Sequence, residues 1–324
     1  MTDKPDLLLI GRVTDRMMDR LRTRFTVHSL FDEADQTAFL TREGARFTAV
    51  STDGHHGLTP APVEFLPNLK VVSSYGVGYD GIDAKGLAEQ GVIVAHTPDV
   101  LNDEVADTAI LLWLAVSRRL IPADAWARSG AWEREGAFPL TRSVQNQTVG
   151  ILGFGRIGQT IAARAEMFNA RVLYHARSPK DVPHTYVESP VELAAASNVL
   201  ICITPGGAGT RHLVNAEVLD ALGPEGILIN VARGSVVDEA ALVAALSEGR
   251  LGGAGLDVFE DEPQIPDALK AMEQVVLTPH VGSATVETRR AMGDLTCDNL
   301  IRFLDEGRVH TPVPECRGLN EAVA

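Results

Sequence analysis

Short runs of β-branched and apolar residues alternate with helix-like segments along nearly the whole chain, and this alternation constrains the fold more than any other feature. Such a pattern is typical of β-α-β units, in which a helix connects two parallel strands. We find no internal repeat with a period of roughly 20 to 50 residues and no low-complexity segment. The sequence therefore predicts an α/β protein built on parallel sheets.

The chain has 324 residues, about twice the usual length of one domain, so two domains are expected. The expected strands of the first part are 7–10, 27–30, 47–51, 71–74 and 92–96. A helical stretch over 102–119 leads to a second group of expected strands, 149–152, 171–175, 198–203, 226–231, 253–258 and 274–277. Few residues follow the amphipathic segment 286–304, so we expect this helix to pack back against the first domain.

Composition excludes several classes of protein. Hydrophobic residues make up 45% and charged residues 22% of the chain, near the average for globular proteins. No apolar run approaches the roughly 20 residues of a membrane span, and residues 1–6 do not resemble a secretion signal, so we expect a soluble cytoplasmic protein. The net charge of −14 disfavours nucleic acid as a partner. Three widely spaced cysteines predict neither disulfides nor a metal site, and Cys202 lies in an apolar run expected in the core.

A glycine fingerprint begins at the end of the expected strand 149–152 and opens a helical pattern. Gly153 permits a tight turn, Gly155 lets a pyrophosphate approach the backbone, and Gly158 lets the helix pack on the strand. The free N–H groups of that helix end favour an anion. Alone the motif is a weak signal, but its position between strand and helix predicts a dinucleotide site. The expected contacts are Gly153, Gly155, Arg156, Ile157 and Gly158.

The next strand ends without the carboxylate that NAD-selective sites use to bind the ribose 2′-hydroxyl. Arg177, Ser178 and Lys180 follow it instead, and they offer two cations and a hydroxyl to a 2′-phosphate. A solvated loop would also carry such charges, but it does not explain the missing acid. The sequence therefore predicts a preference for NADP(H), with NAD(H) possible.

Three polar side chains follow late strands, at the edge where open α/β sheets bind ligands. Arg233 has the planar, permanently charged group that binds the carboxylate and keto oxygen of a 2-keto acid. His280 can give a proton to that oxygen when a carboxylate such as Glu262 orients its ring. Hydride from a nicotinamide would complete the reduction.

These motifs together resemble the D-isomer-specific 2-hydroxyacid dehydrogenase family, closest to its glyoxylate/hydroxypyruvate reductase and hydroxyphenylpyruvate reductase group. The resemblance covers essentially the whole chain, and its further motifs lie at 75–80, 96–101, 105–109, 231–234, 257–263 and 278–282. It implies a flavodoxin-like substrate-binding domain, 1–100 and 287–324, and an inserted Rossmann-type dinucleotide-binding domain, 101–286. The active site would lie in the cleft between them.

The resemblance also implies roles for individual residues. Arg233 would bind the substrate, His280 would act as acid and base, and Glu262 would be its partner. The backbone N–H groups of Val77 and Gly78 would hold the substrate carboxylate. The remaining cofactor contacts would be Pro205, Thr210, Ala232, Asp257, which would meet the nicotinamide carboxamide, and Gly282.

Several questions stay open at this point. The substrate is expected to be a small 2-keto acid such as glyoxylate or hydroxypyruvate, reduced to the D-2-hydroxy acid, although a bulkier arylpyruvate would use the same chemistry. His55 and His56 would either contact its variable group or lie in a surface loop. Trp132 resembles a dimerisation arm, which predicts a homodimer, while Trp113 is expected to be packing. The alternative of another class is a nucleotide-sensing, corepressor-like binding protein built on the same fold.

Overall fold

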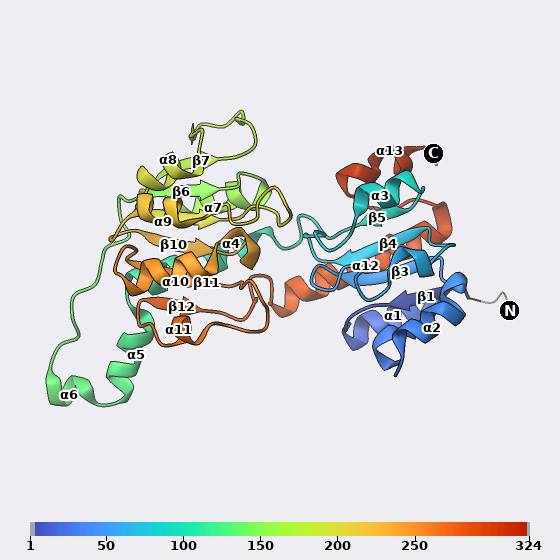
Figure 1. The fold of residues 1–324 in the computed structure, drawn as a ribbon, viewed down its shortest axis with the longest axis horizontal. Helices are drawn as coiled ribbons and strands as arrows, with labels where there is room; N and C mark the ends of the chain where they lie inside the picture. The colour runs from blue at the N-terminus through green and yellow to red at the C-terminus, as the bar shows by residue number, and fades with distance from the viewer. Residues whose placement is uncertain (1–3, 323–324) are drawn as a thin grey trace. The chain divides into compact units, whose positions relative to one another are not determined.

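The computed structural model describes residues 4–322, and these form two compact units. Unit 1 contains residues 4–101 and 285–322, and unit 2 contains residues 102–284. In Figure 1 the blue to cyan elements up to β5 and the red elements from α12 on are those of unit 1, and the elements from α4 to β12 are those of unit 2. Unit 2 is therefore inserted into the chain of unit 1, between its fifth strand and its long carboxyl-terminal helix.

Unit 1 is built on a five-stranded parallel sheet. Its strands are β1 (Asp6–Leu9), β2 (Thr26–Ser29), β3 (Ala49–Asp53), β4 (Val71–Tyr75) and β5 (Ile93–Ala95). Their order is β2-β1-β3-β4-β5, which is the flavodoxin-like order. The helices are α1 (Asp15–Arg24), α2 (Gln36–Glu43), α3 (Ala84–Glu89), α12 (Val286–Glu306) and α13 (Arg317–Glu321).

The long helix α12 closes the core of unit 1. It packs against β4 and against α1, and its Cys297 and Leu300 are fully buried among side chains of the sheet. The polar faces of α1 and α12 are joined by a series of ion pairs, Arg16 and Arg20 with Asp294, Arg20 with Asp298, and Arg24 with Asp305. The helix ends at Glu306, and the left-handed backbone of its C-cap residue, Gly307 (φ 71°), suits glycine.

Unit 2 is built on a seven-stranded parallel sheet. Its strands are β6 (Thr148–Leu152), β7 (Arg171–His175), β8 (Thr185–Tyr186), β9 (Val199–Cys202), β10 (Ile227–Asn230), β11 (Gly253–Leu256) and β12 (Val275–Leu277). The order β12-β11-β10-β9-β6-β7-β8 reverses direction between β9 and β6. This is the doubly wound, Rossmann-type order, which places ligands at the carboxyl end of the strands near that reversal.

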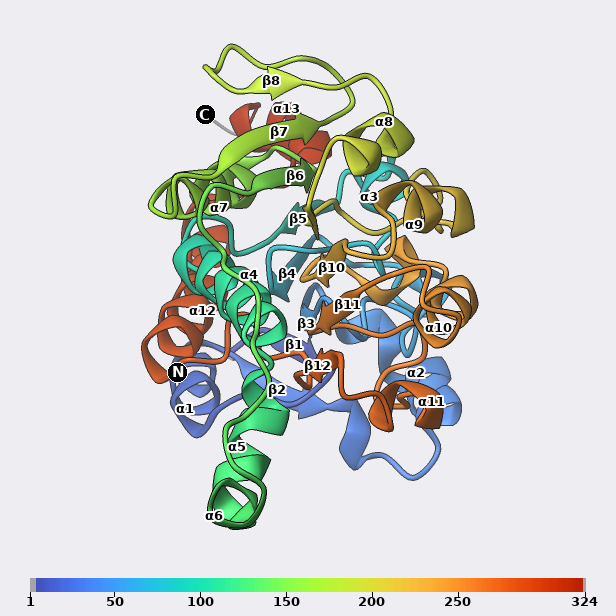
Figure 2. The ribbon, with the colours of Figure 1, turned by 90° about the vertical axis from the view of Figure 1, so that its left-hand side faces the viewer.

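The helices of unit 2 flank this sheet, with two exceptions. The packed helices are α4 (Asn102–Ser117), α7 (Arg156–Glu166), α8 (Pro190–Ala195), α9 (Ala216–Leu222), α10 (Glu239–Ser247) and α11 (Asp267–Lys270). The exceptions are α5 (Leu120–Arg128) and α6 (Ala131–Glu135), which extend away from the sheet of unit 2 in both Figure 1 and Figure 2. We call residues 118–145 the arm.

The expected fold class is confirmed, and the differences lie at the ends of elements. The strand expected over 253–258 ends at Leu256, because the next residue, Asp257, turns its carboxylate to the following loop. The helix expected over 102–119 ends at Ser117, and Arg119 is left-handed (φ 47°). Sequence reasoning did not predict the short strand β8. Cys202 and Trp113 are fully buried, as expected.

No helix within residues 4–322 has the length and apolarity needed to cross a membrane. The same residues contain no group of three His, Cys, Asp or Glu side chains placed to hold a metal ion.

Candidate active site

The glycine fingerprint forms the turn from β6 into α7. Gly153 has φ 101°, a conformation that favours glycine, and a Cβ there would lie 2.8 to 2.9 Å from the backbone of Ile203 and Thr204. A Cβ on Gly158 would lie 2.3 Å from the carbonyl oxygen of Gly153. The two glycines therefore permit the close packing of α7 on β6 and β9.

The start of α7 has the properties of an anion site. Its N-cap is Gly155, and no side chain caps the helix. A Cβ built on Gly155 would meet nothing within 4 Å, so the turn is open on that side. The hydroxyl of Thr204, beside the turn, is buried and has no partner within the described residues. These features fit the pyrophosphate of a dinucleotide, held by the backbone N–H groups of α7.

The loop after β7 carries the predicted 2′-phosphate contacts. Arg177, Ser178 and Lys180 are exposed, and within residues 4–322 the side chains of Arg177 and Ser178 make no hydrogen bond or ion pair. The loop returns to the sheet at β8, where Tyr186 donates to the carbonyl of Ala176 at 3.4 Å. The loop thus begins at the carboxyl end of β7, whose last carbonyl, that of His175, accepts from the N–H of Gly153 in the fingerprint turn.

Arg233 lies in the loop after β10, and the loop is held by Asn230. The Asn230 side chain accepts from the N–H of Ala232 at 3.1 Å and donates to the carbonyl of Arg233 at 3.0 Å. Arg233 Nη1 donates to the carbonyl of Ala232 at 2.7 Å. A Cβ on Gly234 would lie 1.9 Å from the backbone of Phe259, so this glycine brings the Arg233 loop directly against the loop that carries Glu262.

The structure brings His280 and Glu262 together. His280 Nδ1 lies 2.7 Å from Glu262 Oε2, and the other carboxylate oxygen accepts from the N–H of Phe259 at 3.1 Å. The Glu262 side chain is 19% exposed and the His280 side chain 44% exposed. The carboxylate on Nδ1 orients the ring and leaves Nε2 for another partner.

Asp257 organises the loop on which His280 lies. Its buried carboxylate accepts from Thr278 Oγ1 and the N–H of Val281 with one oxygen, and from the N–H of Gly282 with the other. Its carbonyl accepts from the N–H of His280 at 2.8 Å. These bonds hold His280 in a left-handed conformation (φ 52°), which is uncommon for a residue other than glycine.

The remaining predicted cofactor contacts lie in unit 2 near these loops. The hydroxyl of Thr210 donates to the carbonyl of Pro205 at 2.7 Å and so closes the loop after β9. The next residues of that loop are tied to the Arg233 loop, because the N–H of His212 donates to Ser235 O. Thr108 Oγ1 donates to Gly282 O at 3.4 Å.

Val77 and Gly78 belong to unit 1. They follow β4, and the carbonyl of Val77 pairs with Nδ1 of His96 at 2.9 Å. His56 Nδ1 pairs with the carboxylate of Asp53 at the end of β3, and the rings of His55 and His56 lie edge to face.

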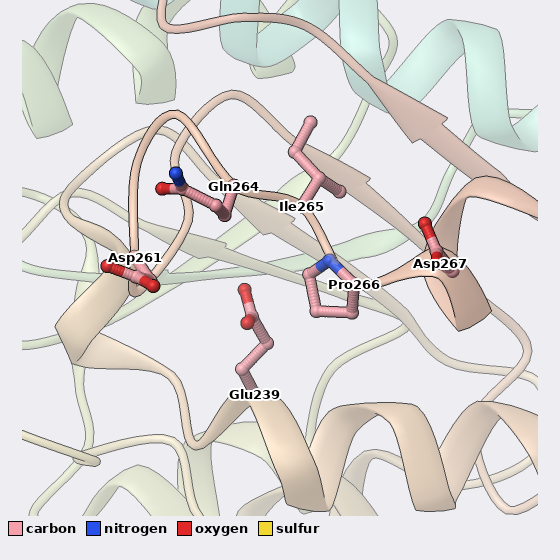
Figure 3. A pocket seen from close by; sticks show the side chains of 6 residues that line it. All are labelled: Glu239, Asp261, Gln264, Ile265, Pro266 and Asp267. Atoms are coloured by element: carbon pink, nitrogen blue, oxygen red, sulfur yellow. The ribbon is translucent and has the colours of Figure 1, made fainter.

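A pocket of a different character lies beside the Glu262 turn (Figure 3). It is lined by Glu239, Asp261, Gln264, Ile265, Pro266 and Asp267, and none of the predicted site residues is among them. Burial and the neighbouring carboxylates of Glu260 and Asp261 raise the pKa of Glu239. Three carboxylates in one pocket oppose the binding of an anionic acid, so this pocket does not suit a 2-keto acid.

Sequence reasoning missed two residues of the site. Thr204 carries the unpartnered hydroxyl beside the fingerprint turn, and Tyr174 lies buried beneath the loop that carries Arg177. A threonine after a strand gives no signal, and Tyr174 has the pattern of an ordinary core residue. Only the fold places both of them at the dinucleotide loops.

Comparison with known proteins gives concordant results. A family model described as "D-isomer specific 2-hydroxyacid dehydrogenase, NAD binding domain" matches residues 110–282. Hydroxyphenylpyruvate reductase of Plectranthus scutellarioides is 45% identical over 95% of this chain and 98% of its own length. Glyoxylate/hydroxypyruvate reductase A of Arabidopsis thaliana is 44% identical over the same shares of the two chains.

A solved structure is similar over nearly the whole chain. It is the NADPH-dependent glyoxylate/hydroxypyruvate reductase of Sinorhizobium meliloti, in complex with NADP and malonate. The identity is 46%, the TM-score is 0.91, and the match covers 97% of this chain and 98% of that one.

Proposed function

Because the chain belongs to the D-isomer-specific 2-hydroxyacid dehydrogenase family, we propose that it reduces a 2-keto acid to the D-2-hydroxy acid with a nicotinamide cofactor. The observation that carries the proposal is the pair of His280 and Glu262 at 2.7 Å, with the loop that carries Glu262 lying against the loop that holds Arg233. The relatives named above are reductases, which favours an enzyme over a nucleotide-sensing protein.

The roles of the three residues follow from their chemistry. Arg233 binds the carboxylate and polarises the keto oxygen through its planar guanidinium. Protonated His280 donates its Nε2 proton to that oxygen, and Glu262 stabilises the positive charge on the ring beforehand. The nicotinamide supplies the hydride to the keto carbon when it is bound. The N–H groups of Val77 and Gly78 in unit 1 contribute to holding the substrate carboxylate.

We further propose that Asp257 acts mainly through the loop it organises. Both of its carboxylate oxygens are already engaged by Thr278, Val281 and Gly282. One of them has room for another hydrogen bond, since a carboxylate offers about four acceptor positions. A contact with the nicotinamide carboxamide therefore adds to the structural role and does not replace it.

The preferred cofactor is NADP(H). Support comes from the exposed Arg177 and Ser178, whose side chains have no protein partner among residues 4–322, and from the absence of a carboxylate at the end of β7. The Arg177→Ala variant should lose about 1 to 3 kcal/mol of NADPH binding, as for a charge-assisted hydrogen bond, with little change for NADH. Equal losses for the two cofactors, measured by fluorescence titration, would contradict this assignment.

The substrate is a small 2-keto acid of the glyoxylate and hydroxypyruvate type. A bulkier arylpyruvate is a second candidate, because a relative at 45% identity is named hydroxyphenylpyruvate reductase. The test is the initial rate at 340 nm with NADPH or NADH and each of glyoxylate, hydroxypyruvate, pyruvate and hydroxyphenylpyruvate. Turnover of hydroxyphenylpyruvate alone would change the assigned substrate to an arylpyruvate. Bound NADPH with no turnover of any of these acids would overturn the enzyme assignment.

The assembly is a homodimer formed through the arm. Leu120, Ile121, Trp132 and Leu140 of the arm are 49% to 99% exposed, and α5 contains no buried residue. So many large apolar side chains on an extended segment of one unit favour burial against a second copy.

A further inference from the structure

One buried side chain connects the two loops that the dinucleotide would contact, and the mechanism above does not use it. Tyr174 in β7 is 1% exposed. Its ring stacks on Phe154 of the fingerprint turn, with centroids 4.2 Å apart and planes 25° apart. Its hydroxyl contacts the loop that carries Arg177 and Lys180.

The hydroxyl of Tyr174 makes two hydrogen bonds to one residue of that loop. It accepts from the backbone N–H of Lys180 at 2.7 Å and donates to the carbonyl of Lys180 at 3.3 Å. Because the donor and the acceptor are both on Lys180, the hydroxyl fixes where the chain passes after Arg177 and Ser178. A phenyl ring in the same place would keep the stacking and lose both bonds.

Other contacts anchor the rest of this loop. Tyr186 bonds to the carbonyl of Ala176 at its start, and the ring of His184 lies against Phe154 near its end. His184 Nε2 also pairs with Glu166 of α7 at 3.0 Å. Between these two anchors, the Tyr174 hydroxyl holds the middle of the loop at Lys180. Lys180 follows closely after Arg177 and Ser178, whose side chains have no partner among residues 4–322.

We propose that Tyr174 is a positioning residue for cofactor selection: its hydroxyl holds the loop so that Arg177 and Ser178 are preorganised for a 2′-phosphate. The inference rests on the proposed preference for NADP(H). Preorganisation lowers the cost of ordering these side chains on binding, and the benefit applies only to a ligand that they contact. NADH, which has no 2′-phosphate, does not gain from it.

The test is the Tyr174→Phe variant of the full-length protein. We expect its KM for NADPH to rise roughly three- to tenfold, as for the loss of one or two hydrogen bonds, with kcat and the KM for NADH nearly unchanged. Adenosine 2′,5′-bisphosphate should weaken as a competitive inhibitor by a similar factor, while 5′-AMP should not. This pair of inhibitors isolates the 2′-phosphate from the rest of the dinucleotide.

Two further variants separate positioning from general damage. Ser197→Ala removes another buried hydroxyl of unit 2, which donates to the carbonyl of Leu193, and it should leave the ratio of NADPH to NADH efficiency unchanged. Tyr174→Leu also removes the stacking on Phe154, so it should weaken both cofactors. Melting temperatures of all three variants control for loss of fold.

The inference is wrong if Tyr174→Phe leaves the ratio of NADPH to NADH efficiency unchanged, whether both cofactors are unaffected or both are weakened equally. The proposed function has a separate failure. If the wild-type protein shows no NADPH preference and Arg177→Ala weakens both cofactors equally, then the 2′-phosphate assignment itself is wrong. If Arg177→Ala weakens NADPH more than NADH and Tyr174→Phe does not, only the proposed role of Tyr174 is wrong.

Discussion

At the scale of single residues, the site depends on His280 being held in an unusual backbone conformation. Its φ of 52° is maintained by the bond from its own N–H to Asp257 O and by the Asp257 carboxylate, which binds the two following N–H groups. The ring nitrogen Nδ1 is then fixed by Glu262. The proposed proton donor is thus positioned through its main chain as well as its side chain.

The first prediction concerns this residue. His280→Gln keeps a hydrogen-bonding side chain but removes the acid, so turnover should fall roughly 10²- to 10⁴-fold while the binding of NADPH stays near normal. Stopped-flow turnover and fluorescence titration would measure the two effects. Turnover at the wild-type rate would remove His280 from the mechanism.

While their roles in catalysis stay a prediction, the placement of Arg233, Glu262 and His280 in loops after strands was predictable from the sequence. The hydrogen bonds and packing contacts between the loops were not predictable. That Asp257 binds the His280 loop, or that Gly234 lies against the backbone of Phe259, depends on how neighbouring loops pack. Contacts of this kind have no signature in residue spacing, because the partners come from separate parts of the chain.

At the scale of elements, apolar periodicity predicted most strands and the long helix α12, since each buries an apolar face. The ends were less predictable, because a polar side chain that folds back can end a strand, as Asp257 does after β11. Strand β8 was missed because it is short and half exposed.

The second prediction concerns the contact between α1 and α12. Hydrogen bonds from Arg16 and Arg24 hold the pKa values of Asp294 and Asp305, respectively, below their usual range. A lowered pKa in the folded protein stabilises the fold at pH values above the unfolded pKa, near 3.8, and that stabilisation disappears as the pH falls through the folded value.

Asp294→Asn should therefore lower the stability of unit 1 by about 1 kcal/mol at pH 7, and the difference from wild type should shrink below about pH 4. Thermal melts over a pH series would measure it. Asp267→Asn is the matched control, because Asp267 pairs with Lys270 at a fully exposed position and should change little. A constant difference at all pH values would contradict the ion-pair explanation.

At the scale of the whole molecule, the arm is the feature that a single copy of the chain leaves most exposed. It extends from unit 2 with large apolar side chains in solvent, and its Trp132 is 68% exposed. Trp126, by contrast, packs on Phe138 and donates to the carbonyl of Gly136, so the arm has its own internal order.

The third prediction follows from the proposed dimer. Sedimentation should show a dimer for the wild-type protein at micromolar concentration, and the double variant Trp132→Glu, Leu140→Glu should shift it to the monomer, because charge on the buried face opposes association. Met167→Glu is the control, since Met167 is 82% exposed and caps the end of α7, outside the arm. A wild-type monomer would contradict the proposal.

The insertion of unit 2 into unit 1 has a consequence during synthesis on the ribosome. The five strands of the first sheet are made early, but the helix that covers β4, α12, is made only after residues 102–284. Unit 2 can therefore complete its sheet first, while the apolar face of β4 still lacks its cover. The sheet made first is therefore the one that waits for its last helix.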